Sequence, residues 1–540
     1  MNYKYYAKSN PIETIKEHTD KLLENLEILK RTYGAKIVQV IDMPEDRFWQ
    51  LMEIICKYHD VGKVYSGFQN VIRKAIGKPL LATKFNNEQI KHEQISPMFV
   101  PYKEYELTKT ERKLVYQAIY YHHERDNIIH MDEQLLNEII KEDIEPNIEK
   151  IENELQIKVP ELKTTYLGMV EGQARITEFD DIYKDYCIMK GLLHRLDHCS
   201  SAWIPVEDET KDEISKFVEE FMKKQNFEPN DLQQFAKANQ NKNVIVIGST
   251  GMGKTEGALL WSNHDKTFFT LPLRISINAI YDRIKETIGY EHAGLLHSTA
   301  IDYLDDKNEE NEFEKIDQAR NLYEKITTCT IDQIFPFVFK YRGYEKIYAT
   351  LSYSKVVIDE IQAYSPEIVA VILKGLQMIN NLNGKFMVMT ATLPRIYKEK
   401  LETEIPVQYN EYESTINANL FETQYNIEKA VKQATNIGKG GNIFENNYNI
   451  LFALIGKKDI KVEMQINEEA AKKIIEDLGT NLPGVVIESS YYIEDNKLII
   501  TKGQSGVKIN TDKMLEELKE KLAESLELLT EKERRVIELY

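Results

Sequence analysis

Histidine and aspartate residues spaced through the first third of the chain have the chemistry of metal ligands. They centre on the pair His59-Asp60 in the segment KYHDVGK, and the set is His18, His59, Asp60, His92, His122, His123 and Asp197. Neutral imidazoles combined with carboxylates form a nitrogen–oxygen ligand set that suits manganese, iron, cobalt or nickel. These side chains could hold two metal ions with Asp60 between them. Two adjacent ions activate a water molecule and neutralise the charge that builds up in phosphodiester cleavage.

Any one of these histidines could instead be an ordinary packed core residue. We assign three other histidines to that class: His130, His194 and His198. A second histidine–aspartate pair, His264-Asp265, is expected to lie at the surface because no further ligand residues surround it. The set of seven candidate ligands indicates a metal site more strongly than any single histidine does, since its members all occur within one helical segment. Gly62 lies just beyond its central pair and permits a close approach of backbone.

A glycine-rich segment, VIVIGSTGMGKTEGALL, has the chemistry of a phosphate-binding loop. It satisfies G-x-x-x-x-G-K-[ST] with Gly248, Gly253, Lys254 and Thr255, and Gly251 lies inside it. An apolar strand precedes the motif and a helix follows, which is the context that it requires. Backbone N–H groups at a helix N-terminus surround phosphate oxygens. We expect Lys254 to reach the β- and γ-phosphates of ATP and Thr255 to coordinate magnesium.

An acidic pair complements this loop further along the chain. Asp359-Glu360 ends the apolar run in KVVIDEIQAYS. Asp359 suits a magnesium contact, and Glu360 suits a base that orients the attacking water. Upstream, in PNDLQQF, either Gln233 or Gln234 is a candidate contact to adenine. Together these residues predict an ATP–magnesium site.

The elements that must position these residues fall into four regions. Residues 1–205 place apolar side chains at three- and four-residue spacings and are predicted to be almost wholly helical. Residues 206–240 form a helical connector. Residues 241–405 alternate short β-rich runs with helical segments, the signature of a parallel α/β sheet. Residues 406–540 read as a small α+β tail. The fold class is multidomain: all-α, then an α/β P-loop domain, then the tail.

Composition excludes several classes of protein. A net charge of −18 over 540 residues argues against a uniformly basic nucleic-acid-coating protein, although a local basic groove is compatible with it. The four cysteines form no C-x-x-C pair, which excludes a disulfide framework and a zinc ribbon and fits a reducing cytosol. Neither a signal peptide nor an apolar run of about 18 residues is evident. We therefore expect a cytoplasmic protein without a membrane span.

The ligand set resembles the HD phosphohydrolase superfamily, in particular the HD nuclease domain of the CRISPR-associated nuclease–helicase of type I systems. The shared order over residues 5–205 is an early His, HDxGK, a histidine in HE, a double histidine and a late Asp. The resemblance implies two metal sets, one of His18, His59, Asp60 and Asp197, the other of Asp60, His92, His122 and His123. It also implies Asp60 as a catalytic residue and Lys63 near the scissile phosphate.

The P-loop region is similar to the first RecA-like domain of a superfamily 2, DEAD/DEAH-like helicase. Three further segments carry this resemblance: LPLRISINAIYDRI with Arg274, TTCTIDQIF with Thr330, Asp332 and Gln333, and VMTATLP with Thr390 and Thr392. DEIQAYSP and TIDQ are particular to the same CRISPR-associated family. Membership would imply antiviral defence, with single-stranded DNA and the crRNA-guided Cascade surveillance complex as partners.

The tail departs from that family. Residues 395–540 contain no Q-x-x-G-R-x-x-R segment of a second RecA-like domain; their paired arginines, Arg534-Arg535, have no glycine nearby. Residues from about 421 instead resemble the peptidoglycan-binding repeat of VanW-type cell-envelope proteins, with a turn at Gly503, Gly506 and Asn510. The simplest account is a truncated nuclease–helicase joined near residue 420 to an unrelated segment, as a natural fusion or an assembly error. We expect ATP binding, slow hydrolysis, no translocation, and a nuclease that does not need the motor.

Two alternatives remain open from the sequence. The first is a non-catalytic remnant whose tail binds peptidoglycan or a protein partner. The second is an HD phosphohydrolase that acts on free nucleotides and uses the α/β domain as an ATP sensor.

Overall fold

The computed structural model describes most of residues 4–392 and scattered segments beyond. The described residues are 4–85, 87–123, 131–249, 251–307, 312–341, 343–392, 404–409, 412–417, 424–425, 464–465, 468–480, 490–494, 497–501, 510–517 and 519. The chain divides into two compact units. One comprises residues 1–364 and 374–392, and the other comprises residues 365–373 and 393–540.

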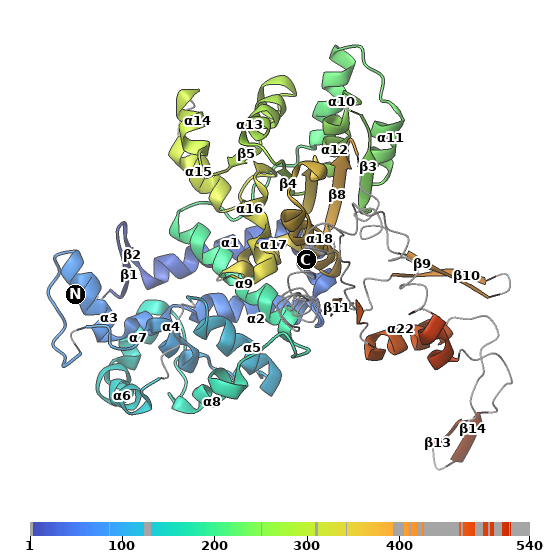
Figure 1. The fold of residues 1–540 in the computed structure, drawn as a ribbon. Helices are drawn as coiled ribbons and strands as arrows, with labels where there is room; N and C mark the ends of the chain where they lie inside the picture. Colours follow the sequence, from blue (N-terminus) through green and yellow to red (C-terminus); the bar gives the residue numbers. More distant parts are fainter. Residues whose placement is uncertain are drawn as a thin grey trace, which may run out of the picture. The chain divides into compact units, whose positions relative to one another are not determined.

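The first part of the first unit is helical, as predicted (Figure 1). Its main helices are α1 (Ile15–Ile37), α2 (Glu45–Tyr58), α3 (Ser66–Ala75), α4 (His92–Ile95), α5 (Lys109–Tyr120), α6 (Glu133–Ile139), α7 (Ile148–Leu155), α8 (Leu167–Val170) and α9 (Tyr183–Ser201). The sequence reading missed a hairpin of β1 (Tyr6–Ser9) and β2 (Ile12–Thr14), whose strands are too short to show alternation.

Local sequence signals explain where the longer helices begin. Thr14 caps α1 by accepting a hydrogen bond from the Glu17 N–H, and the Glu17 carboxylate accepts one from the Thr14 N–H. Thr108 and Glu111 form the same capping box at α5. Each box satisfies N–H groups that the first helical turn leaves unpaired. α9 is buried on nearly every face, so it is the central helix of this region.

A parallel six-stranded sheet follows the connector helices α10 (Ile214–Lys224) and α11 (Asp231–Ala238). Its strands are β3 (Val244–Ile247), β4 (Thr267–Thr270), β5 (Ala293–Leu296), β6 (Ile326–Cys329), β7 (Lys355–Asp359) and β8 (Lys385–Thr390). Their order is β3-β8-β7-β4-β6-β5. Sequence periodicity indicated β3, β4, β7 and β8 but not β5 (AGLL) and β6 (ITTC), in which glycine or threonine occupies interior positions and interrupts the apolar run.

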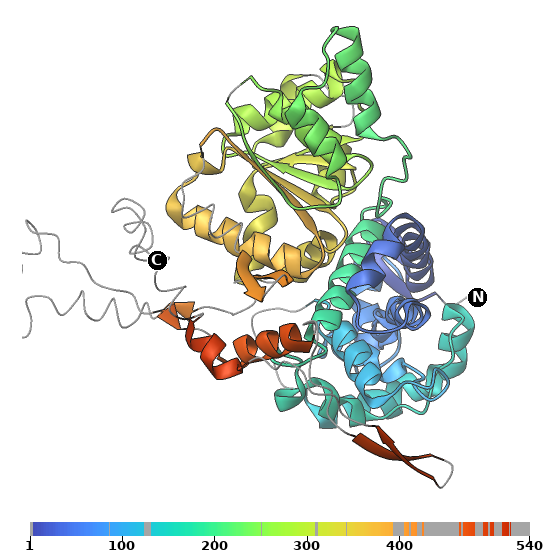
Figure 2. The same cartoon turned by 90° about the vertical axis from the view of Figure 1, so that its right-hand side faces the viewer.

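Helices flank the sheet on both sides (Figure 2). The helices of this part of the chain are α12 (Lys254–Ser262), α13 (Arg274–Asp282), α14 (Ala300–Asp306), α15 (Glu312–Arg320), α16 (Ile331–Ile334), α17 (Tyr344–Leu351) and α18 (Pro366–Asn381). In a parallel sheet the carboxyl ends of all strands lie at one edge, which is where such folds bind ligands. The P-loop follows β3, Asp359-Glu360 ends β7, and Thr390 ends β8. The topology therefore brings the three nucleotide motifs together.

The helical region and the sheet are tied together inside the first unit. A Cβ placed on Gly191 of α9 would lie 2.0 Å from the Glu345 carbonyl oxygen of α17, so only glycine permits this approach. Beside it, the buried Lys190 ammonium lies 2.8 Å from the Glu345 carboxylate. The contact fixes α9 against the helix that leads into β7.

The described residues of the second unit include short paired strands and the helix α22 (Glu468–Thr480). β9 (Glu404–Tyr409) pairs with β10 (Tyr412–Asn417), β11 (Gln424–Tyr425) with β12 (Met464–Gln465), and β13 (Ser490–Glu494) with β14 (Lys497–Thr501), all antiparallel. This composition is α+β. Of the predicted turn, Gly503 and Gly506 lie outside the described residues, and so do Arg534-Arg535. Asn510 accepts a hydrogen bond from the Lys513 N–H at 3.0 Å.

Candidate metal centre and nucleotide site

The predicted metal ligands come from five helical segments and meet in one place. α1 supplies His18, the end of α2 supplies His59 and Asp60, α4 supplies His92, the residues after α5 supply His122 and His123, and α9 supplies Asp197. All are buried except His123, which is partly buried. Ionisable side chains are rarely buried in such a group unless they pair with one another or with a metal ion.

The carboxylate of Asp60 lies at the centre of this cluster. Its Oδ1 is 3.2 Å from His92 Nε2 and 3.8 Å from His122 Nε2. Its Oδ2 is 3.5 Å from His59 Nε2 and 3.7 Å from His18 Nε2. The two oxygens therefore face different pairs of histidines, which is the geometry that a bridging carboxylate needs.

Two overlapping ligand groups share Asp60. The donor atoms within each group all lie within 4.8 Å of one another; one group is Asp60, His92, His122 and His123, and the other is His18, His59 and Asp60. Asp197 adjoins the second group, with its Oδ1 3.0 Å from His18 Nε2. The structure thus brings all seven predicted side chains together, in the grouping that the resemblance implied.

Backbone carbonyls orient two of the imidazoles toward the centre. His59 Nδ1 lies 2.9 Å from the Cys56 carbonyl oxygen, and His122 Nδ1 lies 2.6 Å from that of Ile119. Each contact places the proton on Nδ1 and leaves the Nε2 lone pair facing inward, as in most histidine–metal sites. Neither Nε2 has a hydrogen-bond partner among the described residues, although both are buried. The residues therefore fit a bound metal ion.

Local backbone geometry explains why a glycine, Gly62, follows closely after the His59-Asp60 pair. Asp60 has φ −107° and ψ 1°, in the sparsely populated bridge region where many active-site residues lie. A Cβ on Gly62 would lie 2.2 Å from the His92 carbonyl oxygen. The Gly62 N–H donates to Ser96 Oγ at 2.9 Å, and the Ser96 hydroxyl donates to the same His92 carbonyl. This close approach sets His92 beside Asp60.

Burial and neighbouring charge shift the pKa values in opposite directions across the cluster. Burial opposes the charged form of Asp60, yet Lys63 and the histidines hold its pKa well below the usual range. Burial lowers the pKa of His122 far below its usual range and that of His123 to about 4. These two imidazoles are therefore neutral near pH 7, which is the form that binds metal ions.

His18 and His92 have the opposite shift. Burial disfavours their charged forms, but carboxylates beside them raise their pKa values overall. Two of these carboxylates were not identified from the sequence as part of the site: Glu13 Oε2 lies 3.5 Å from His18 Nδ1, and Glu88 Oε1 lies 3.9 Å from His92 Nδ1. Glu13 is brought in by the unpredicted hairpin. Glu93, the glutamate of the HE segment, also lies close, with its Oε2 3.3 Å from His92 Nδ1.

Lys63 belongs to the cluster as well. Its ammonium lies 2.7 Å from Asp60 Oδ2 and is buried. Lys63 thus places a positive charge beside the central carboxylate; its role near a scissile phosphate remains a prediction.

Two residues differ from the predictions made for the remaining histidines, His198 and Asp265. His198 is exposed rather than packed in the core, whereas His194 Nδ1 is buried, without a hydrogen-bond partner among the described residues. His264 is exposed, but Asp265 is not a surface residue; it is buried 2.5 Å from Lys36 Nζ and 2.9 Å from Lys355 Nζ. The error arose because pairing partners distant in sequence are invisible to local pattern. His130 lies outside the described residues.

The nucleotide motifs line one pocket of about 580 Å³, a size typical of small-molecule sites. Among its lining residues are Gln233, Gly251, Gly253, Lys254, Thr255, Asp359 and Glu360. Gly251 and Gly253 have φ +85° and +73°, which favour glycine at both positions. The Lys254 ammonium donates to the Gly248 carbonyl at 2.9 Å and lies 3.6 Å from the Glu360 carboxylate.

The acidic pair is connected to the segment after β8. Burial, together with the neighbouring Glu360 carboxylate, raises the pKa of Asp359 to about 6. Gln362, which was not singled out from the sequence, donates to the Glu360 carboxylate and is hydrogen-bonded to the Thr390 hydroxyl. Glu360 itself has φ +55°. Hydrogen bonds from Thr390 through Gln362 to Glu360 thus link the TAT segment, which begins at Thr390, to the predicted base.

The two candidate glutamines differ in placement. Gln233 lines the pocket and donates to the Gly253 carbonyl at 3.4 Å, whereas Gln234 is exposed and donates to the Pro229 carbonyl. Arg274 begins α13 as an exposed residue. Thr330 precedes α16, which contains Asp332 and Gln333, joined to each other at 2.6 Å. These residues follow β4 and β6, at the same edge of the sheet as the pocket.

Comparison with known proteins relates the chain to one group of nucleases and helicases. Residues 229–400 match the family DEAD/DEAH box helicase, and residues 415–528 match the family described as "Putative peptidoglycan binding domain". A CRISPR-associated nuclease/helicase Cas3 from Methanothermobacter thermautotrophicus is 29% identical over 276 residues, which are 47% of this chain and 32% of that protein.

Solved structures show the fold of the first unit. The crystal structure of T. fusca Cas3-ADP has a TM-score of 0.52 at 16% identity and covers 74% of this chain and 52% of its own. A crystal structure of a CRISPR-associated protein has the same TM-score at 14% identity, over 82% and 61%. This chain thus spans a third to three fifths of the length of these proteins. The chain is thus similar to Cas3 proteins in part of its sequence and in fold, and its residues 229–400 match the DEAD/DEAH box helicase family. No helix of the described part is long and apolar enough to cross a membrane.

Proposed function

We propose that the helical region is a metal-dependent nuclease of the HD class that cleaves single-stranded DNA. The observation that carries the proposal is the pair of ligand groups that share Asp60, with its two oxygens facing different histidines. The similarity to a Cas3 nuclease/helicase supports DNA as the substrate and CRISPR-associated antiviral defence as the role.

The chain's own residues divide the chemical tasks as follows. His59 and His122 present Nε2 lone pairs, and Asp60 lies between the two groups. Divalent manganese, iron, cobalt or nickel ions held there would supply an activated hydroxide and neutralise charge on the phosphodiester. Lys63, beside Asp60, would pair with a non-bridging phosphate oxygen and so orient the scissile bond. Burial of the cluster strengthens each of these electrostatic interactions.

The α/β domain is proposed to bind ATP with magnesium. Lys254 would contact the β- and γ-phosphates, Thr255 and Asp359 would hold magnesium, and Glu360 would orient the attacking water. Gln233 is the better placed of the two glutamines to contact adenine, because it lines the pocket. Within these 540 residues no Q-x-x-G-R-x-x-R segment supplies the arginines that complete such a site. We therefore propose that this polypeptide by itself hydrolyses ATP slowly and does not translocate.

The proposed partners are displaced single-stranded DNA and a crRNA-guided Cascade complex. Their support is the resemblance to type I systems and to Cas3. Recruitment is tested by adding the protein to a Cascade complex bound to target DNA and measuring co-migration. Binding that requires the displaced strand would support the partnership, and equal binding to Cascade without DNA would contradict it.

Cleavage of circular single-stranded DNA tests the nuclease. The wild-type chain with each divalent metal ion in turn should open the circles, with or without ATP, and Asp60→Ala should abolish opening. Asp20→Ala, which changes an exposed carboxylate on α1, is the matched control and should cleave normally. Release of phosphate from free nucleotides in preference to DNA cleavage would instead indicate a nucleotide phosphohydrolase.

A second candidate function belongs to the tail. The match of residues 415–528 to a peptidoglycan-binding family favours binding of cell-wall polymer. Sedimentation of the full chain with purified peptidoglycan tests it. Retention that soluble muropeptides compete away would support the candidate, and retention equal to that of an unrelated acidic protein would contradict it.

A further inference from the structure

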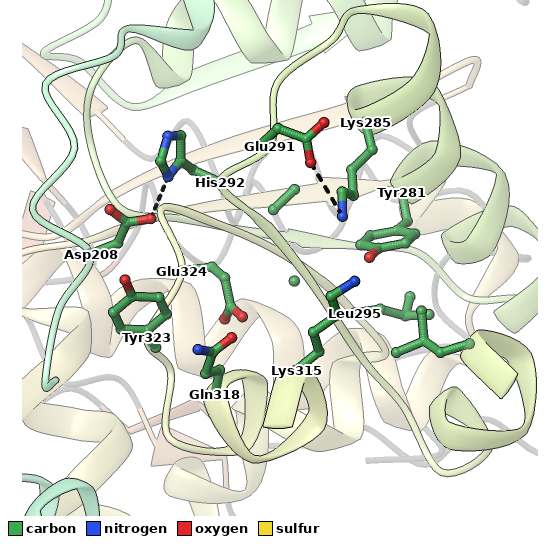
Figure 3. A pocket seen from close by; sticks show the side chains of 13 residues that line it. Asp208, Tyr281, Lys285, Glu291, His292, Leu295, Lys315, Gln318, Tyr323 and Glu324 are labelled. Atoms are coloured by element: carbon green, nitrogen blue, oxygen red, sulfur yellow. Dashed lines mark hydrogen bonds and ion pairs between the residues drawn. The ribbon is translucent and has the colours of Figure 1, made fainter. Parts of the chain in front are cut away.

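A second pocket lies at the amino-terminal edge of the sheet, at the opposite ends of the strands from the nucleotide motifs. Figure 3 shows the side chains that line it. It has a volume of about 160 Å³ and lies beside the beginning of β5 and the residues that lead into β6. Its walls come from α13, α14, α15 and the segment after α13. Neither the metal cluster nor the P-loop shares a residue with it.

The most unusual group in this pocket is the carboxylate of Glu324. Its side chain is more than nine-tenths buried, and Oε2 has no hydrogen-bond partner among the described residues. A Cβ on Gly294, in the neighbouring strand, would lie 2.7 Å from this carboxylate, so the glycine makes room for it. A buried carboxylate oxygen without a hydrogen-bond partner is costly, and a ligand that donates to this carboxylate would offset the cost.

The other carboxylates of the pocket already have partners. Asp208 Oδ2 lies 2.6 Å from His292 Nδ1, and Glu291 Oε2 lies 3.5 Å from Lys285 Nζ at the mouth, where Glu291 is largely exposed. Figure 3 shows both pairs at one side of the cavity. Glu324 is therefore the acceptor that an incoming molecule would find available.

The walls limit the size and polarity of that molecule. Leu295, Leu304 and the ring of Tyr281 supply apolar surface close to the carboxylate. A cavity of this volume admits only a few non-hydrogen atoms, roughly the size of benzene. Short chains or rings that carry one strong hydrogen-bond donor meet both conditions.

We propose that this pocket binds a small organic cation, a primary ammonium or amidinium compound, through the Glu324 carboxylate. The ammonium or amidinium group would donate to the Glu324 carboxylate, and the hydrocarbon part would pack against Leu295, Leu304 and Tyr281. Charge-assisted hydrogen bonds of this kind are stronger than neutral ones. The proposal does not depend on the nuclease function.

The ionisation of Glu324 gives the proposal a second, independent readout. Burial, foremost, raises the pKa of Glu324 to about 7. The charged and titratable groups around it are Asp208, Lys266, Tyr281, Lys285, Glu291, His292, Lys315 and Tyr323. A cation requires the ionised carboxylate, so its affinity should rise about tenfold per pH unit below 7 and level off above.

The test uses n-propylammonium as the probe, with n-butyrate and n-butanol as anionic and neutral controls. Its binding to the full chain is measured by calorimetry or ligand-observed NMR. We expect saturable binding to the wild type, a loss of at least tenfold in Glu324→Gln, and no loss in Glu314→Gln, which changes an exposed carboxylate of α15. Should Glu324→Gln fail to fold, the pH profile of the wild type decides. Equal binding of butyrate, unchanged binding in Glu324→Gln, or an affinity independent of pH between 5.5 and 8 would each overturn the proposal.

Discussion

At the residue scale, the metal cluster depends on a few positions at which a larger side chain does not fit. Asp60 lies between four imidazoles, and Gly62 lets the backbone of His92 come close enough to complete the group. Positions held this tightly by backbone contact are sensitive to a single added methyl group.

Gly62→Ala should therefore reduce both stability and metal affinity. The added Cβ would lie 2.2 Å from the His92 carbonyl oxygen, so α4 must shift and carry His92 away from Asp60. We expect a loss of about 1–3 kcal/mol in the free energy of unfolding and a loss of at least tenfold in metal affinity. Gly168→Ala, where nothing lies within 4 Å of an added Cβ, is the control for both measurements.

Glu324 predicts a pH dependence of stability with a definite sign. Its pKa is about 7 in the folded chain and near the ordinary value of 4.5 in the unfolded chain. Folding favours the protonated form of Glu324. Its contribution to the free energy of unfolding is therefore fully present below about pH 4.5 and is lost as the pH rises through 7. Urea unfolding should show Glu324→Gln more stable than the wild type at pH 8 by about 1–3 kcal/mol, and similar at pH 5. A constant difference across that range would contradict the assignment.

At the element scale, a buried ionic network joins the helical region to the sheet. Glu207 accepts hydrogen bonds from Arg195 of α9, from Lys266 before β4 at 2.7 Å and from the Tyr353 hydroxyl before β7 at 2.9 Å. All four side chains are buried. α9 also carries Asp197, so the same helix serves the metal cluster and the anchor to the sheet.

Glu207→Gln should destabilise the fold strongly because it leaves Arg195 and Lys266 buried without a countercharge. Breaking a buried pair from one side costs about 3–5 kcal/mol. The neighbouring Glu209→Gln removes the partner of Arg31 in an exposed pair and should cost about 0–1 kcal/mol. Chemical denaturation of both variants measures the contrast, and equal effects would show that the network does not hold the elements together.

The sequence pattern predicted most helices and strands but not all of the residues that contact one another. Apolar runs gave β3, β4, β7 and β8, whereas β5 and β6 are short, and glycine and threonine interrupt their apolar pattern. The seven metal-ligand candidates were identified from motif order and resemblance, because imidazoles and carboxylates are chemically distinctive. The partners Glu13, Gln362 and Lys355 were missed, since each is brought to its site by tertiary packing over a long sequence separation or by a turn.

At the scale of the whole molecule, the chain combines regions that match different protein families. Residues 229–400 match a DEAD/DEAH box helicase, and residues 415–528 match a peptidoglycan-binding family. The P-loop and the acidic pair, both within residues 229–400, line one pocket, which is the proposed nucleotide site.

The purified 540-residue chain should therefore bind ATP with magnesium but turn it over slowly. Arginines supplied across a domain interface typically contribute about 10³ to 10⁵ in rate, and the segment that would carry them does not occur in these residues. Lys254→Ala should abolish binding of a fluorescent ATP analogue, while Lys237→Ala, on the exposed face of α11, should not. Rapid, DNA-stimulated hydrolysis by the wild-type chain would contradict this prediction.

The most direct test of the proposed two-metal centre, which the two ligand groups sharing Asp60 would hold, is the metal stoichiometry of the purified chain. Equilibrium dialysis against manganese, combined with electron paramagnetic resonance, should give two ions per chain with a spin-coupled signal. In Asp60→Ala the coupling should disappear and at least one ion should be lost. A single uncoupled ion in the wild type, or the same two ions in the variant, would contradict the account.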